Sequence, residues 1–169
     1  SGATCTLDGA LVRANVKALE GSRLFVLNSH VTGNVQGDEA SVVHVIGGRV
    51  DGNIQIEKGT SPGEVGALVQ GTVVTEGDIQ IKEMRTGEVR VDGADVRKGN
   101  LQVVENVVGV RLHLVFNAVA GNGQVFENEG AGEKLVQDND VSQNLQCKEN
   151  RGPFIGGPNT AGDTEGQCY

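Results

Sequence analysis

The sequence contains no tryptophan, one tyrosine and four phenylalanines in 169 residues, and only three prolines. A core of ordinary width normally uses more aromatic side chains than this, because each of them fills a large volume. The interior must instead be built from Val, Ile, Leu and Ala, which are spread evenly along the chain. This composition favours one domain with a narrow, uniform core.

An excess of positive charge is also missing, as is any long apolar run. The formal net charge is −8 at pH 7, and no cluster of Lys and Arg offers a footprint for a phosphate backbone, so we expect no nucleic-acid partner. No apolar stretch approaches the roughly 18–20 residues of a membrane-spanning helix, so we expect no membrane insertion. The first residues show no signal segment, which indicates that none existed or that it has been removed.

Motifs that build a catalytic or metal site are absent too. The three histidines are scattered, and the sequence has no HExxH, GxSxG, P-loop or CxxC pattern. We therefore expect neither a cofactor nor a bound metal, and a protein without enzymatic activity is favoured.

What the chain does have is a repeat. The phrase VDGNIQI, from Val50 to Ile56, returns in altered form along nearly the whole chain. The polar residue ahead of its apolar-Gln pair recurs at intervals of 19, 19, 25, 22, 22 and 22 residues. These anchor positions are Asn15, Asn34, Asn53, Asp78, Asn100, Asn122 and Asn144. Repeats of this length are typical of solenoids, in which each copy stacks on its neighbours.

Each copy contains three short apolar segments with the alternation of β-strands, and none has helical periodicity. Left-handed coils usually show a stricter six-residue repeat. We therefore expect an all-β protein, a right-handed parallel β-helix (β-solenoid) of about seven coils of 19–25 residues, over residues 1–150. Residues 151–169 break the repeat and are rich in Gly and Pro, which predicts an irregular C-terminal cap of the same domain.

The longest interval holds an insertion, Lys58 to Gly66, with the sequence KGTSPGEVG. Its Gly, Ser and Pro predict a bulge from one turn of the coil. Insertions on one side of a solenoid often mark its binding side, and a tolerated surface excursion is the alternative.

Two columns of amides accompany the repeat. The anchor Asn column is expected to form a structural ladder at a bend. The second column lies two residues after each anchor and faces outward. Its members are Gln36, Gln55, Gln80, Gln102, Gln124 and Gln146, with Lys17 in the first copy. Two interpretations stay open: stacked amides stabilise the sheet, or the row binds polysaccharide hydroxyls. The expected ligand contacts are Gln36, Gln55, Gln80, Gln102 and Gln124.

An acidic column lies five residues after each anchor. Its members are Glu20, Glu39, Lys58, Glu83, Glu105, Glu127 and Glu149. Like charges on neighbouring strands repel one another, so a solvated edge is expected. Ca²⁺ binding by carboxylates of adjacent coils is the alternative, although the Asp-rich calcium repeat is missing.

The best cluster of reactive side chains comprises Arg90, Arg111 and His113, on outward positions of neighbouring strands. Many β-helix enzymes that cleave acidic polysaccharides use basic residues on one face. These three residues are therefore the alternative catalytic set, while basic residues that only improve solubility are the simpler interpretation.

The three cysteines are expected to differ. A disulfide between Cys147 and Cys168 would fold the tail over the open end, with Phe154 and Ile155 as an apolar plug. Closing this loop would contribute roughly 3 kcal/mol. Cys5 aligns with inward positions and is expected to be buried, and a partner for a cysteine lost upstream is the alternative. A disulfide implies an oxidising compartment, so we expect a secreted or cell-surface location. The closed end argues against filament growth.

With these residues the chain resembles small secreted bacterial right-handed parallel β-helix proteins of unassigned function. The likeness is carried by Thr4-Cys5-Thr6-Leu7, by the Gly-Asn-Val-Gln coils and by the ending Asn144-Leu145-Gln146-Cys147 with Gly166-Gln167-Cys168. It implies the fold and export, and it brings no catalytic residues. The chain departs from the pattern at Gly123 and Gln143. A weaker likeness to bactofilin-type β-helices is opposed by the cysteine-closed tail.

The sequence therefore favours a secreted or surface-exposed structural or adhesive module, a monomer or weak oligomer. Its candidate partner is an extracellular polysaccharide or another cell-surface component. A polysaccharide lyase or hydrolase is the first alternative, and a subunit of a β-helical assembly is the second.

Overall fold

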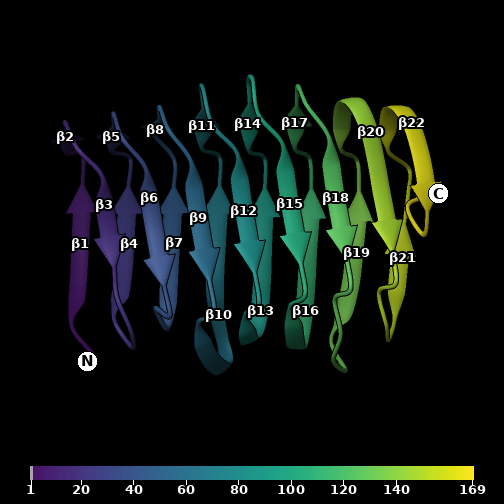
Figure 1. Ribbon diagram of the computed structural model, residues 1–169, viewed down its shortest axis with the longest axis horizontal. Coiled ribbons are helices and arrows are strands. Elements are labelled where there is room, and N and C mark those ends of the chain that lie inside the picture. The colour runs from purple at the N-terminus through teal and green to yellow at the C-terminus, as the bar shows by residue number, and fades with distance from the viewer. Residues whose placement is uncertain (1) are drawn as a thin grey trace.

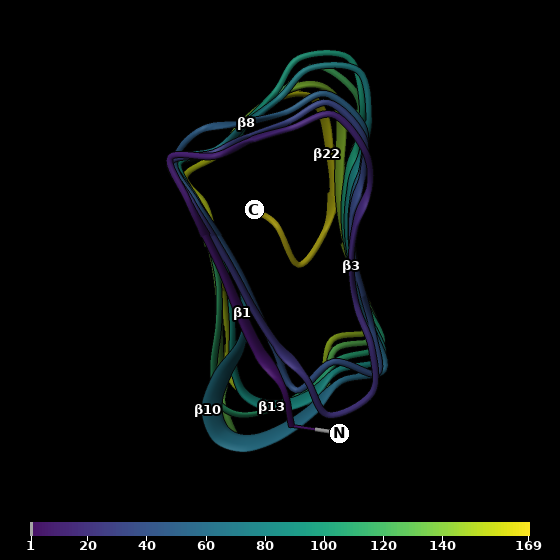
Figure 2. The ribbon, with the colours of Figure 1, turned by 90° about the vertical axis from the view of Figure 1, so that its left-hand side faces the viewer.

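The computed structural model describes residues 2–169, and all regular structure in that range is β-strand. The coils stack along one axis from the N-terminal to the C-terminal end (Figure 1). Seen from the N-terminal end, the chain runs up β1 (Thr4–Asp8), across β2 (Leu11–Val12) and down β3 (Val16–Ala18) while it recedes from the viewer (Figure 2). This winding is right-handed, and neighbouring coils pair in parallel. The expected right-handed parallel β-helix is confirmed.

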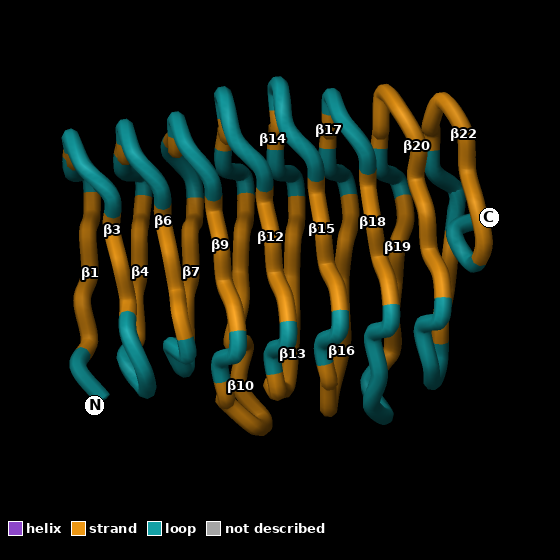
Figure 3. The backbone as a smooth tube through the Cα atoms, in the orientation of Figure 1, coloured by secondary structure: helices purple, strands orange, loops and turns teal. Residues whose placement is uncertain are grey.

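Each coil contributes strands to three faces, and turns lie at the corners between them (Figure 3). Face A is formed by β1, β4 (Arg23–Leu27), β7 (Val42–Ile46), β10 (Thr60–Gln70), β13 (Arg85–Asp92), β16 (Val107–Val115), β19 (Glu133–Gln137) and β21 (Phe154–Gly156). Face B is formed by β2, β5 (His30–Val31), β8 (Arg49–Val50), β11 (Val73–Val74), β14 (Asp95–Val96) and β17 (Ala118–Val119). Face C is formed by β3, β6 (Val35–Asp38), β9 (Ile54–Glu57), β12 (Ile79–Lys82), β15 (Leu101–Val104) and β18 (Gly123–Phe126). Near the C-terminus, β20 (Asp140–Lys148) and β22 (Thr160–Gly166) run through both face B and face C.

The core is one continuous apolar column enclosed by the three faces. Side chains alternate along each strand, so in β12 the buried Ile79 and Ile81 point inward while Gln80 points out. The register stacks apolar residues on apolar residues in neighbouring coils, since Ile79 pairs with both Ile54 and Leu101. The narrow core of Val, Ile and Leu that the composition predicts is what the chain forms.

The corner between faces B and C explains the Gly-Asn pair of the repeat. The backbone N–H of Asn53 donates to Oδ1 of Asn34 at 2.7 Å. A Cβ on Gly52 would lie 2.3 Å from that same oxygen and 2.9 Å from the carbonyl oxygen of Gly33. At Gly52 the coils can stack this closely only because the residue before the anchor has no Cβ. The structural ladder expected for the Asn column is confirmed.

Two further Asn ladders lie at the other two corners, and all their members except the half-buried Asn159 are buried. They comprise Asn106, Asn128 and Asn150 between faces C and A, and Asn117, Asn139 and Asn159 between faces A and B. In the first, the Asn128 amide donates to the Val103 carbonyl and to Oδ1 of Asn150, both at 2.9 Å. Neither ladder was predicted, although both repeat at intervals close to those of the anchor column.

The insertion bulges as expected, and it does so within a strand. The register of β10 against β13 shifts between Ser61 and Val65 and again before Ala67. The bulge packs against face A, where Arg23 pairs with Glu64 at 2.9 Å and Nε2 of His44 lies 2.8 Å from the carbonyl oxygen of Val65. Figure 2 shows β10 protruding from this side of the coil.

The C-terminal tail is more regular than expected. Its two strands continue the coil, because β21 pairs with β19 and β22 pairs with β20. The Cys147–Cys168 disulfide is present and both cysteines are buried. Phe154 packs against the core, but Ile155 is 42% exposed, because it pairs with Leu135 on an outward position. The prediction that Ile155 plugs the end is wrong.

Cys5 pairs with the inward Leu24, as the alignment predicts, yet its side chain is exposed and free. No described residue stacks on the other side of β1, so an inward position there stays open. The expectation that Cys5 is buried is therefore wrong.

Candidate functional site

The Gln row on face C is a continuous hydrogen-bonded ladder. Each amide nitrogen donates to the Oε1 of the glutamine in the following coil. The distances are 3.0 Å for Gln36 to Gln55, 3.3 Å for Gln55 to Gln80, 3.0 Å for Gln80 to Gln102 and 2.8 Å for Gln102 to Gln124. The side chains are half-buried, and strand pairing holds them about 4.8 Å apart.

The ladder leaves part of each amide free for other contacts. A primary amide has two N–H donors and two acceptor lone pairs, and a ladder uses one of each. An inner glutamine such as Gln80 therefore keeps one donor and one acceptor. The amide row therefore stabilises the sheet and still offers a hydrogen-bond donor and an acceptor at each coil from Gln36 to Gln124.

The first coils add charge beside this row. Lys17 takes the place of a glutamine and pairs with Asp38 at 3.7 Å. A hollow of about 300 Å³ opens there. Its charged and amide lining residues are Lys17, Gln36, Asp38, Gln55, Glu57 and Lys58. This end of the row is polar and mixed in sign.

The acidic column forms the corner between faces C and A, and from Glu39 onward its backbone is left-handed. The φ angle is +56° at Glu39, +54° at Glu83, +58° at Glu105 and +53° at Glu127. Left-handed backbone costs roughly 1–2 kcal/mol for a side chain other than glycine. The turn before each buried corner residue requires this conformation, so the column has a structural cause that its charges did not reveal. No group of three or more metal-ligating side chains lies close together among the described residues.

The alternative catalytic set is brought together on face A. Arg90 pairs directly with His113, and Arg111 lies two residues earlier on the same strand and the same face. Acidic residues accompany them, since Arg111 lies 3.7 Å from Glu88 and Arg90 lies 3.7 Å from Asp92. Burial, with smaller effects of the two arginines, lowers the pKa of His113. Among the buried side-chain atoms of residues 2–169, Nε of Arg90 alone lacks a hydrogen-bond partner.

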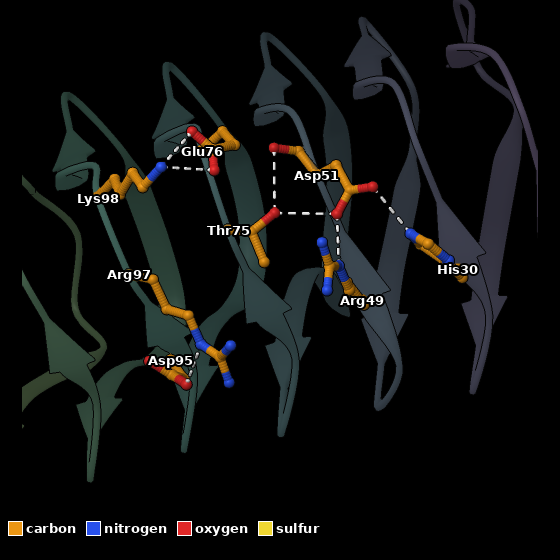
Figure 4. A network of polar contacts seen from close by, with 8 residues as sticks. All are labelled: His30, Arg49, Asp51, Thr75, Glu76, Asp95, Arg97 and Lys98. Carbon is orange, nitrogen blue, oxygen red and sulfur yellow. Dashed lines mark hydrogen bonds and ion pairs between the residues drawn. The ribbon is translucent and has the colours of Figure 1, made fainter.

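A charged network on face B was not predicted (Figure 4). Asp51 accepts hydrogen bonds from Nε2 of His30 at 2.9 Å, from Thr75 at 2.9 Å and from Arg49. The contacts of His30 and then of Arg49 lower the pKa of Asp51 to about 2. Since these residues come from three successive coils, the network links neighbouring coils. Thr75 shares the column of Asp51, whereas His30 and Arg49 lie in the neighbouring column, so the pattern of no single column shows the whole network.

One lysine lies in the core. Lys134 occupies the inward column between Leu112 and Phe154 and is fully buried. Its Nζ donates to the carbonyl oxygens of Gly132 at 2.9 Å and Gly130 at 3.1 Å. Burial lowers the pKa of this ammonium group. In the sequence, the signal for this buried lysine was a charged residue in a column of otherwise apolar residues.

Comparison of the chain with protein-family models, curated proteins and solved structures gave no match. Within residues 2–169, no helical stretch has the length and apolarity needed to cross a bilayer.

Proposed function

We propose that this chain is a non-catalytic structural or adhesive module that works outside the cell and contacts an extracellular polysaccharide through the Gln row of face C. The observation that supports it best is the unbroken ladder from Gln36 to Gln124. Each coil of this ladder presents a free amide donor and acceptor at one regular spacing. A polymer of hydroxylated rings offers complementary groups at regular intervals along its length.

The Cys147–Cys168 disulfide supports the location in this proposal. Disulfides persist in oxidising compartments and are rare where thiols are kept reduced. A secreted or cell-surface protein meets polysaccharide in such an environment.

The test is binding of the protein to a panel of extracellular polysaccharides, with Gln55, Gln80 and Gln102 replaced together by Thr. Thr keeps a polar, strand-favouring side chain while it removes the amides. We expect the triple variant to fold and to lose binding. A matched control replaces Gln70 and Gln137, which lie on face A. Absence of any glycan binding, or normal binding by the triple variant, would refute the proposal.

A lyase or hydrolase remains the second candidate because Arg90, Arg111 and His113 share one patch of face A. The lowered pKa of His113 favours the neutral imidazole, which can accept a proton. Incubation with acidic polysaccharides, followed by detection of unsaturated products, tests it. Cleavage that disappears in Arg111→Ala would replace the binding proposal with an enzymatic one.

A further inference from the structure

A second outward row runs along face C beside the Gln row, two residues further along each strand. In its middle stand Val104 and Phe126, which are paired in register on neighbouring strands. Both are partly exposed, and Lys82 and Lys148 bound them in the same row. The two apolar side chains lie about 7 Å from the Gln row, since a strand rises about 3.4 Å per residue. They form a small apolar platform beside the amides.

Carboxylates border the other edge of this platform. Glu105 and Glu127 directly follow the two apolar residues at the corner between faces C and A. A hollow of about 250 Å³ opens at this corner and is lined by Glu105, Val107, Glu127, Glu129, Glu149 and Arg151. Arg151 pairs with Glu129 at 3.2 Å. Within residues 2–169, no basic group lies within 4.0 Å of the other three carboxylates.

We infer that this part of face C binds a cationic amino-sugar polymer, an inference that rests on the proposed polysaccharide contact and specifies its ligand. The C–H face of a sugar ring would cover Val104 and Phe126, as apolar surfaces attract one another in water. Ring hydroxyls would bond with the free amide groups of Gln102 and Gln124. An ammonium group would lie toward Glu105 and Glu127.

Charge decides between sugar polymers. The formal net charge of the chain is −8, and the hollow holds four carboxylates against one arginine. Of the two lysines that bound the platform, Lys148 is paired with Glu165. An acidic polysaccharide would bring like charge to this corner, whereas an amino sugar relieves the repulsion between the stacked glutamates. A neutral polymer would use the amides and the apolar platform but would leave the carboxylates unpaired.

The test measures binding of short glucosamine oligomers to the intact protein by calorimetry. We expect binding that weakens as salt rises from about 0.1 M to about 1 M, because the screening length falls from about 10 Å to about 3 Å. Phe126→Ala should bind about tenfold more weakly, and the double variant E105Q/E127Q should lose both affinity and the dependence on salt. Phe116→Ala is the matched control, since Phe116 is 65% exposed at the corner between faces A and B. It should bind normally.

Other probes distinguish a failure of this inference from a failure of the proposed function. Equal binding of N-acetylated or acidic oligomers, or normal binding by a folded Phe126→Ala, overturns this inference. The proposed function stands in that case if the triple Gln variant still abolishes binding. Tight binding of a lysine oligomer that is insensitive to Phe126→Ala would show a general cation surface and would also overturn the inference. Thermal unfolding of each variant confirms that it is folded.

Discussion

Asn106 donates both its backbone N–H and its side-chain amide to Oδ1 of Asn128, over 3.1 Å and 2.9 Å. The remaining amide hydrogen of Asn106 bonds with the carbonyl of Ile81 at 3.1 Å, and its Oδ1 accepts the backbone N–H of Met84 at 3.0 Å. A buried amide is costly only when its groups lack partners. This one is fully bonded, so a polar residue can turn the backbone at an apolar corner.

Replacing Asn128 by Leu should destabilise the fold by about 3 kcal/mol or more, because several buried backbone and amide groups lose their partner at about 1–3 kcal/mol each. The half-buried Asn34 of the anchor column provides the comparison. Asn34→Ala should cost about 1 kcal/mol. Denaturant unfolding of both variants measures the difference, and equal losses would contradict a special role for the buried ladder.

Gly99→Ala should be strongly destabilising, by about 2–3 kcal/mol. A Cβ at this position would lie 2.0 Å from the carbonyl oxygen of Gly77, which is backbone and cannot move aside. Gly109→Ala is the control, because its Cβ would lie 3.8 Å from the nearest atom considered, the carbonyl oxygen of Thr86. That variant should stay within about 0.5 kcal/mol of the natural protein. Thermal unfolding would show the contrast.

Glu105→Asn should stabilise the protein by about 1 kcal/mol. Asn tolerates the left-handed backbone at φ +58° better than Glu does, and it removes one charge from the acidic column. Glu105→Gln removes the charge but keeps the backbone cost, so it should recover less of the gain. The increase with Gln should shrink at high salt, where repulsion between carboxylates is screened. A loss of stability with Asn would show that the left-handed turn carries no strain.

The lowered pKa of Asp51 predicts how the stability of the fold changes in acid. Its pKa is lowered to about 2 by His30 and Arg49, so the charged form favours the folded state. This contribution is complete above the ordinary pKa of about 3.8 and is lost as the pH falls through about 2. Asp51→Asn should melt at a lower temperature than the natural protein at neutral pH, and the two curves should converge between about pH 4 and pH 2. A gap in melting temperature that stays constant through this range would contradict the argument.

The cysteines should differ in reactivity in the folded protein. Cys5 is exposed and free, so a thiol reagent should modify one group without denaturant. Cys147 and Cys168 should react only after reduction and unfolding, since both are buried and bonded to each other. Replacing both by Ser should cost roughly 3 kcal/mol for a loop of this length. Cys5→Ser serves as the control and should leave stability unchanged.

Much of the fold could be predicted because period and alternation act on every coil. The Gly-Asn corner, the inward Val and Ile, and the stacked glutamines all follow from one repeated local pattern. Features set by a coil's neighbours could not be predicted in this way. Cys5 has an inward register, but its exposure depends on what stacks beyond β1. Ile155 was expected to plug the open end, but its pairing with Leu135 places its side chain on the outer face.

The candidate site was predicted in part. The Gln column was identified with its outward direction, whereas the direction of its hydrogen bonds required the structure. The acidic column was interpreted through charge, because nothing in a glutamate residue signals a left-handed backbone. The contacts of Asp51 with His30 and Arg49 join residues from different columns, so inspection of single columns could not reveal them.

The buried Asn ladder between faces C and A has a consequence for size. Asn106, Asn128 and Asn150 make equivalent bonds at one 22-residue interval, and Gln167 ends the series by accepting from Asn150 at 3.1 Å. Asn128 accepts hydrogen bonds from the Asn of the preceding coil and donates equivalent bonds to the following coil. A gene could therefore lengthen or shorten the rod by whole coils without redesigning either end, and the number of such coils would fix the length of each face that one molecule presents.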